Sequence, residues 1–315
     1  MPALGRSLRK RYKTYLFEKE ALSVKRNLHI CLIAVLVGVL LIAGCASGPP
    51  KPEQPSTPSA VQPEEEIAVA DIEETVICDQ NGIVVTAKGL SYGGLFGPEL
   101  KIVAENKTNR TVTIQARDVS VNDYMVSVIF SCDVAPGKSA VDEITFQNSS
   151  LELIGIETFG KIELKLHVFD ADSFGDLFDT DVIVLHTTAY EHIEPPSVPE
   201  GIKVYEGNGI RISALGLTDE PDWLGRSLYF HVENDTDRDI VVQVREVSVN
   251  GFMVDTIMSS TVAAGKKMVD DLLIMESSLE EAGIQTVENV EFYFHIFDDD
   301  TWEAIADTDV IVLEF

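Results

Sequence analysis

Two loops rich in carboxylates hold the residue types best suited to chemistry. Residues 170–181 read DADSFGDLFDTD, and residues 298–309 read DDDTWEAIADTD. Clustered carboxylate oxygens suit Ca²⁺, a hard cation that takes roughly six to eight oxygen ligands. A calcium site would use Asp170 and Asp172 in the first loop and Asp298 and Asp300 in the second. The spacing matches the helix–loop–helix calcium motif poorly, because Phe174 occupies a ligand position. A solvated loop between two strands is the alternative.

A histidine lies shortly before each loop. His167 is followed by VFD, and His295 is followed by IFD. Strand alternation places each histidine on the face opposite an apolar row, beside Phe169 or Phe297. Such a pair belongs either to a binding surface or pH-sensitive contact, or to ordinary cross-strand packing with a hydrogen bond. No Ser/His/Asp set, nucleophile elbow, phosphate-binding loop or metal-ligating helix motif occurs in the sequence. We therefore expect a protein that is not an enzyme.

The acidic loops lie near the ends of two copies of an internal duplication. LKIVAENKTNRTVTIQARDVSVNDYMV begins at Leu100, and LYFHVENDTDRDIVVQVREVSVNGFMV begins at Leu228, an offset of 128 residues. Each copy contains short segments in which apolar and polar residues alternate, which predicts half-buried antiparallel strands. We expect an all-β protein with two tandem immunoglobulin-like antiparallel β-sandwiches, at residues 74–188 and 201–315, joined by a proline-rich linker at 189–200.

Three local patterns refine this expectation. Asn250-Gly251, and Asn122-Asp123 in the first copy, suit tight hairpin turns. The apolar alternation changes phase at Arg117-Asp118 and at Arg245-Glu246, which predicts a β-bulge in each copy. SSLE occurs at Ser149 and at Ser277, each followed by a glycine, Gly155 or Gly283. This spacing predicts a capping box and one short helical turn.

Cys78 and Cys132 lie in the first copy, and Tyr205 and Ser260 replace them together in the second. Their joint loss is what a disulfide would produce, and an exported protein could form one. Two separate thiols remain the alternative.

The charge of the chain is strongly asymmetric. From Cys45 onward there are 16 Lys/Arg against 50 Asp/Glu, a net charge of −34. Phosphates repel such a body, so we expect no nucleic-acid partner.

The N-terminal segment has the features of an export signal. Lys25 and Arg26 precede the apolar run Ile30–Ala43. A helix of this run is about 21 Å long at ~1.5 Å per residue, too short for a hydrocarbon core of ~30 Å. We therefore expect a signal peptide over residues 1–44. The region before Lys25 is unusually long for one, so we expect translation to start at Val24.

Ile42-Ala43-Gly44-Cys45 resembles a bacterial lipobox, the recognition site of lipoprotein signal peptides. The resemblance implies that Cys45 becomes the first residue of the mature protein and carries a diacylglyceryl group. An uncleaved membrane helix is the alternative. Residues 45–73 are rich in Pro, Ser and Glu, a composition that predicts a disordered, extended stalk.

The tandem modules with ENxTxR, VSVN and HxFD resemble an uncharacterised group of Gram-positive, clostridial-type surface lipoproteins with immunoglobulin-like repeats. The resemblance implies a fold and a lipid-anchored, extracytoplasmic location, but no reaction. We expect a non-catalytic binding or scaffold module for an envelope or extracellular partner, which is a protein or a glycan. The alternative function is a calcium-regulated surface module that uses residues 170–181 and 298–309.

Overall fold

The computed structural model describes residues 70–315, and these residues belong to one compact unit. The expected signal peptide, the start at Val24, the lipidated Cys45 and the stalk before Ala70 lie outside the described residues. Within the described part of the chain, no helix is both long enough and apolar enough to span a membrane.

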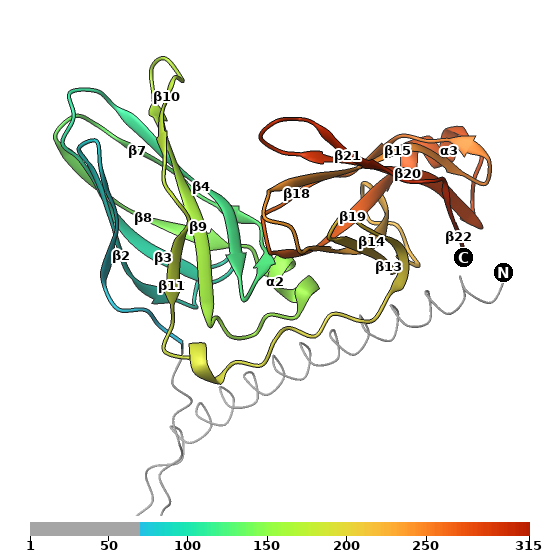
Figure 1. The fold of residues 1–315 in the computed structure, drawn as a ribbon, viewed down its shortest axis with the longest axis horizontal. Helices are drawn as coiled ribbons and strands as arrows, with labels where there is room; N and C mark the ends of the chain where they lie inside the picture. The colour runs from blue at the N-terminus through green and yellow to red at the C-terminus, as the bar shows by residue number, and fades with distance from the viewer. Residues whose placement is uncertain (1–69) are drawn as a thin grey trace, which may run out of the picture. The chain divides into compact units, whose positions relative to one another are not determined.

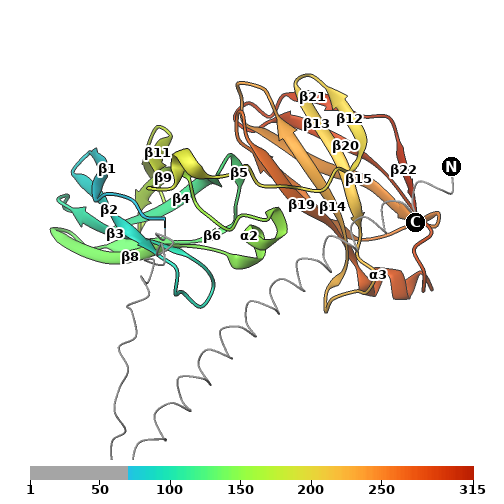
Figure 2. The ribbon, with the colours of Figure 1, turned by 90° about the horizontal axis from the view of Figure 1, so that it is seen from below.

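The first repeat folds as two antiparallel sheets packed face to face (Figure 1). Its elements are β1 (Thr75–Gln80), β2 (Ile83–Ser91), β3 (Glu99–Asn106), β4 (Val112–Val121), β5 (Tyr124–Met125), β6 (Val128–Ile129), β7 (Ser131–Val134), β8 (Lys138–Phe146), α2 (Asn148–Ile154), β9 (Lys161–Asp170), β10 (Asp176–Asp179) and β11 (Ile183–His186). One sheet has the order β1-β2-β3-β8-β6. The other contains β10-β9-β4-β5, with β7 beside β4 and β11 beside β9. Figure 2 shows β3 and β8 in one layer and β4 and β9 in the other.

The second repeat has the same strand order. The 3₁₀ turn η1 (Tyr190–His192) and an irregular segment connect it to the first repeat. Its elements are β12 (Ile202–Gly207), β13 (Ile210–Leu217), β14 (Gly225–Asn234), β15 (Ile240–Val249), β16 (Phe252–Met253), β17 (Thr256–Ile257), β18 (Ser259–Val262), β19 (Lys267–Met275), α3 (Glu276–Glu281), β20 (Asn289–Asp298), β21 (Ala304–Asp307) and β22 (Ile311–Glu314). The expected tandem immunoglobulin-like sandwiches are therefore present, and their equivalent strands differ by the offset of the duplication.

The expected turns and bulges are confirmed. Asn250 and Gly251 have φ of 52° and 81°, as a tight primed turn requires, and β15 pairs with β16 across this turn. The register of β4 against β9 shifts between Arg117 and Ser120, where Asp118 has φ of 51°. The register of β15 against β20 shifts at the equivalent residues. Each bulge lets one strand keep its apolar side chains inward on both sides of the phase change.

The expected short helices are present, but the capping box is wrong. α2 begins directly after Gln147 and α3 directly after Met275, and neither N-cap makes a side-chain hydrogen bond. The preceding strands β8 and β19 run almost into the helices, so the helices start before the serines. The next serine of each SSLE serves a neighbouring loop instead, because Ser150 Oγ accepts from Ser127 N (3.2 Å) and Ser278 Oγ accepts from Asp255 N (2.9 Å).

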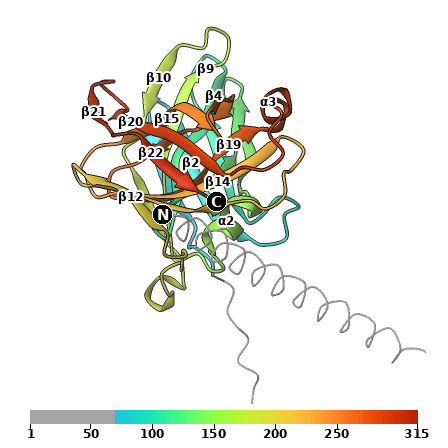
Figure 3. The ribbon, with the colours of Figure 1, turned by 90° about the vertical axis from the view of Figure 1, so that its right-hand side faces the viewer.

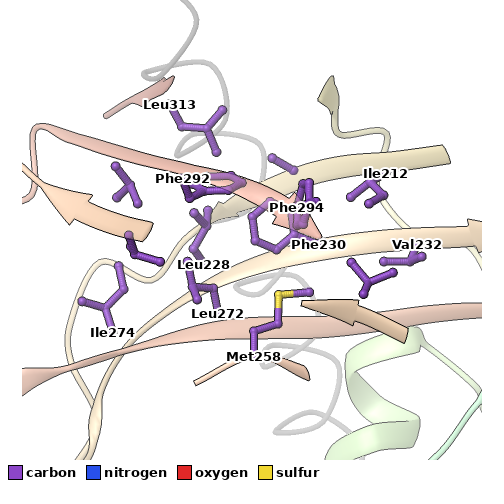
Figure 4. Packing of buried hydrophobic residues seen from close by; sticks show 14 of the residues in the cluster. Ile212, Leu228, Phe230, Val232, Met258, Leu272, Ile274, Phe292, Phe294 and Leu313 are labelled. Atoms are coloured by element: carbon purple, nitrogen blue, oxygen red, sulfur yellow. The ribbon is translucent and has the colours of Figure 1, made fainter. Parts of the chain in front are cut away.

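The core of each repeat lies between its sheets. In the second repeat, Phe230 from β14 meets Phe292 and Phe294 from β20 in edge-to-face contacts with ring centroids 5.2–5.6 Å apart (Figure 4). All three rings are at most 1% exposed. Burying a Phe side chain stabilises the fold by about 1.5–3 kcal/mol. Phe292 and Phe294 thus fix β20 to the core, and β20 carries the hairpin described below.

The ENxTxR motif ties the end of one sheet to the other sheet. Asn106 Nδ2 donates to Arg110 O (2.8 Å) and to Val134 O (2.7 Å). Its Oδ1 accepts from Thr108 N (2.9 Å) and Thr108 Oγ1 (2.7 Å). Asn234 makes the same set of contacts in the second repeat. Both amides are at most 1% exposed, so the shared motif has a structural role.

Candidate binding hairpins

Each repeat carries a hairpin with an acidic, aromatic tip. We call residues 167–179 of β9–β10 the first acidic hairpin and residues 295–307 of β20–β21 the second (Figure 1). At the first tip, Phe174 N donates to Asp170 O (2.9 Å), and Asp170 N donates to Gly175 O (2.9 Å). At the second tip, shown from another side in Figure 3, Trp302 N donates to Asp298 O (2.9 Å). The two loops therefore share one backbone conformation.

The first carboxylate of each loop holds that conformation. Asp298 Oδ1 accepts from Thr301 N (2.9 Å), Thr301 Oγ1 (3.0 Å) and Asp300 N (3.2 Å). Asp170 makes the equivalent contacts with the residues that follow it. Hydrogen bonds from these backbone and hydroxyl groups lower the pKa of both carboxyls, and a nearby Arg guanidinium adds to the effect.

The four predicted calcium ligands therefore fall into two groups. Asp170 and Asp298 point into their own loops as caps, whereas Asp172 and Asp300 are exposed. Among residues 70–315, no group of three or more His, Cys, Asp or Glu side chains is placed to hold a metal ion. The geometry therefore matches the loop interpretation of these carboxylates, and calcium binding stays an untested alternative.

The outermost residue of each tip is an aromatic in an unfavourable backbone conformation. Phe174 has φ of 57° and is 77% exposed, and Trp302 has φ of 61° and is 75% exposed. For a residue with a Cβ, the left-handed region costs roughly 1–2 kcal/mol. Each ring stacks on an aromatic of the preceding strand, with centroid distances of 6.4 Å to Phe169 and 5.5 Å to Phe297. Both repeats thus hold a large apolar ring in water at an energetic cost.

The two histidines continue this stack toward the sheet. His167 lies 5.4 Å from Phe169, and its Nδ1 is 2.7 Å from Asp179 Oδ1. His295 lies 5.3 Å from Phe297, and its Nδ1 is 2.6 Å from Asp307 Oδ1. The expected hydrogen bond and cross-strand packing are confirmed.

The expected outward position of the histidines needs a correction in the first repeat. His167 is 4% exposed, although it faces away from the sandwich core. Asp176 also approaches it, with Oδ1 3.4 Å from Nε2. Ala304 occupies the position of Asp176 in the second hairpin. His295 keeps a side-chain exposure of 20% there.

Sequence reasoning missed the role of the tip aromatics. From the sequence alone, Phe174 is notable only because it occupies a ligand position of the calcium motif. The available signal was the duplication itself, because an aromatic residue recurs at the same offset in a turn where Gly or Asn is usual.

Cys78 and Cys132 are both free and buried. The structure therefore has two separate thiols at these positions and no disulfide between them. Burial raises the pKa of the Cys78 thiol. Burial together with the neighbouring Asp142 raises the pKa of the Cys132 thiol to about 12. These thiols are therefore structural side chains without nucleophilic character at neutral pH.

Comparison with known proteins gives only a distant structural resemblance. The sequence matches no protein-family model, and a search of curated proteins found no match. Among solved structures, the YadV chaperone is 11% identical with a TM-score of 0.22, and the alignment covers 69% of this chain and 92% of that one. The Salmonella enterica SafA pilin in complex with the SafB chaperone is 11% identical with a TM-score of 0.21, covering 69% and 89%. The Pseudomonas aeruginosa CupB2 chaperone is 11% identical with a TM-score of 0.18, covering 69% and 92%. Such TM-scores carry no argument about function, so the sandwich assignment rests on the strand pairing of this chain.

Proposed function

We propose that this chain is a non-catalytic binding module that a diacylglyceryl group on Cys45 holds at the extracytoplasmic face of a membrane. The lipobox-like Ile42-Ala43-Gly44-Cys45 supports the anchor, and the Pro-rich stalk supports a body held away from the lipid surface. Two or more acyl chains give stable anchoring, whereas one alone binds marginally.

The main support for a binding role is that the tip of both acidic hairpins carries an exposed aromatic residue with a left-handed backbone conformation. A strained residue that persists at two equivalent sites indicates a function that offsets its cost. Residues 170–181 and 298–309 contain no Lys or Arg, and Arg110 and Arg238 pair with the cap carboxylates Asp170 and Asp298 at the base of each loop. The remaining charges of each loop are all carboxylates, so the surroundings of each ring are mainly anionic. Lys and Arg side chains bind the face of such a ring by a cation–π interaction and pair with the carboxylates around it. The partner is therefore a protein surface with exposed basic residues.

The test compares three forms of the mature lipoprotein as bait in detergent-solubilised envelope. They are the wild-type chain, Phe174→Ala with Trp302→Ala, and a control with Val184→Ala and Val312→Ala. The control residues are 49% and 52% exposed and lie on β11 and β22, at equivalent positions of the two repeats. We expect a basic protein that the wild-type and control chains retain and the tip variant loses, with release at high salt. Equal capture by all three forms would overturn the hairpins as the binding surface.

The anchor is tested independently by mass spectrometry of the membrane-bound chain. The expected N-terminal peptide begins at Cys45 and carries the mass of the lipid. A peptide that continues through Gly44 into an unmodified Cys45 would contradict the proposal. N-terminal sequencing of the uncleaved precursor would show the initiator methionine at position 24 followed directly by Lys25 and Arg26, and an intact segment of residues 1–23 would refute that start.

A further inference from the structure

The two repeats contact each other through different parts of the same module. The hairpin after β4 of the first repeat, residues 122–125, meets the beginning of β19 in the second. Lys267 N donates to Asp123 O (2.9 Å), and Tyr124 pairs with Lys267 in parallel register. The Tyr124 ring also stacks on His231, with centroids 5.8 Å apart. We call residues 122–125 the donor hairpin and the start of β19 the acceptor edge.

Charge complementarity strengthens this contact. Lys266 Nζ lies 3.1 Å from Asp123 Oδ1 and also pairs with Glu163 Oε2. Lys161 of the first repeat binds the same two carboxylates, at 2.6 Å and 3.1 Å. Lys165 Nζ reaches across to Asp239 Oδ2 of the second repeat (3.0 Å). The three lysine side chains are at least two thirds buried, so these pairs are less screened than exposed surface pairs.

The donor hairpin and the acceptor edge each have an equivalent in the other repeat, and that equivalent is exposed. Tyr124 of the donor hairpin is 6% exposed, whereas its equivalent in the second repeat, Phe252, is 55% exposed. Met125 is half-buried, whereas its equivalent Met253 is 68% exposed. Val269 on the acceptor strand is 6% exposed, whereas its equivalent on β8, Val141, is 80% exposed. The chain therefore carries a free donor hairpin on its second repeat and a free acceptor edge on its first.

We propose that a second copy of this chain occupies these surfaces, head to tail. The hairpin at residues 250–253 of one copy lies against β8 of the next, and Phe252 takes the position beside Ser139 that Tyr124 takes beside Lys267. Glu291 is the equivalent of Glu163, and Lys138 is the equivalent of Lys266, so this ion pair is reproduced between copies. Donor and acceptor are different surfaces, so two copies cannot satisfy both of them in one symmetric contact. Repetition of the contact generates either an open array or a ring of several copies.

The contact between copies is weaker than the contact within the chain. Gly251 replaces Asp123, and Ser139 replaces Lys267, so part of the ionic network is lost while the apolar surface remains. The net charge of −34 on residues 45–315 also opposes association. Salt screens that repulsion over roughly 8 Å at physiological ionic strength. We therefore expect an array that strengthens with added salt.

The beginning of β8 can accept a hairpin from another copy along one edge. β8 pairs with β3 from Lys138 to Thr145, but with β6 only at Thr145 and Phe146. Ser139 and Val141 lie several residues before that pairing. In the second repeat, β17 occupies only the far end of β19 in the same way, and β5 takes the near end. The free end of β8 thus has the space that β5 fills on β19.

The test is a disulfide ladder on the full chain in its membrane, with mild copper–phenanthroline oxidation. Ser139→Cys with Phe252→Cys places one thiol on each free surface. We expect dimers, trimers and longer species on a non-reducing gel, with a yield that rises between low and moderate salt. Each single variant should give no ladder.

Two matched controls make the result decisive. Tyr124→Cys with Lys267→Cys cross-links the template contact within one chain and shows that the register allows a disulfide. Val184→Cys with Val312→Cys has comparable exposure and reports random collisions. A working template pair without a Ser139–Phe252 ladder, or a ladder no stronger than the collision control, would overturn the proposal. Dimers from Phe252→Cys alone would also overturn it, because they indicate a symmetric hairpin-to-hairpin contact.

Discussion

Replacing Asn106 by Asp tests whether the ENxTxR motif is a structural staple. The change is almost isosteric, and the retained oxygen still accepts from Thr108. The new oxygen, however, faces Arg110 O and Val134 O, which now receive 2.8 and 2.7 Å hydrogen bonds from Asn106 Nδ2. Two carbonyl groups lose their donor at a site that is 1% exposed. At neutral pH, a carboxylate is also left against two carbonyl dipoles.

Each buried acceptor left without a donor costs about 1–3 kcal/mol, so we expect a loss of about 4 kcal/mol in the free energy of unfolding. For a domain of this size, that loss lowers Tm by roughly 15 °C, at ~4 °C per kcal/mol. The buried acid has a raised pKa, so the loss grows as the pH rises above about 4 and shrinks below it, where a protonated Asp can donate one bond. Urea unfolding at pH 7 and pH 4 measures both effects.

Two further variants make the result interpretable. Asn234→Asp repeats the test in the second repeat, where the same contacts exist, and should cost a similar amount. Asn148→Asp is an exposed control at the start of α2. A loss below about 1 kcal/mol at both Asn106 and Asn234 would refute the staple, since it would mean that water satisfies these carbonyls.

The other predictions concern the second tip, the core beneath it and the thiols. Trp302→Asn should change the free energy of unfolding by less than about 1 kcal/mol in a urea titration, because relief of the left-handed strain offsets the lost stacking; Phe294→Ala should cost about 3–5 kcal/mol by the same measurement. Because the folded-state pKa of Asp298 is lowered, its contribution is present above the ordinary carboxyl pKa and is lost as the pH falls through the lowered value. The protection factors of the amides at the second tip, which correct for the pH dependence of intrinsic exchange, should therefore fall in acid, and Asp298→Asn should remove that dependence. Cys78 and Cys132 should resist alkylation at pH 8 in the folded chain and react equally after unfolding with or without reductant; an increase with reductant would indicate a disulfide instead.

The strands, turns and bulges could be predicted because local sequence encodes them. A period of two, an Asn-Gly pair and a phase change in the apolar pattern each act within a few residues. The bulge at Arg117-Asp118 is the clearest case, since only a register shift could keep the apolar residues on both sides of it inward. Asp118 duly takes a positive φ, at 51°.

Features that depend on distant neighbours could not be predicted. The predicted helix starts are wrong because the ends of β8 and β19 determine where α2 and α3 begin. The serines of SSLE therefore lie inside the helices rather than at their N-caps. The role of Asn106 depends on Val134, which lies 28 residues away. The left-handed Phe174 is set by the loop cap Asp170, which the sequence alone presents only as a candidate calcium ligand.

Duplication supplies an internal comparison that separates two kinds of surface. Phe174 and Trp302 have nearly the same exposure, at 77% and 75%, so each tip faces solvent in its own repeat. Val141 and Val269 differ greatly, at 80% and 6%, because only one acceptor edge is covered within the chain. An assembly built on the open edge would present many tips together, and linked sites bind a multivalent partner far more tightly than single sites do. A charge at the edge, as in Val141→Glu, should therefore weaken capture of a multivalent basic partner and leave binding of a monovalent one unchanged. If both kinds of binding fell equally, the edge and the tips would be one surface.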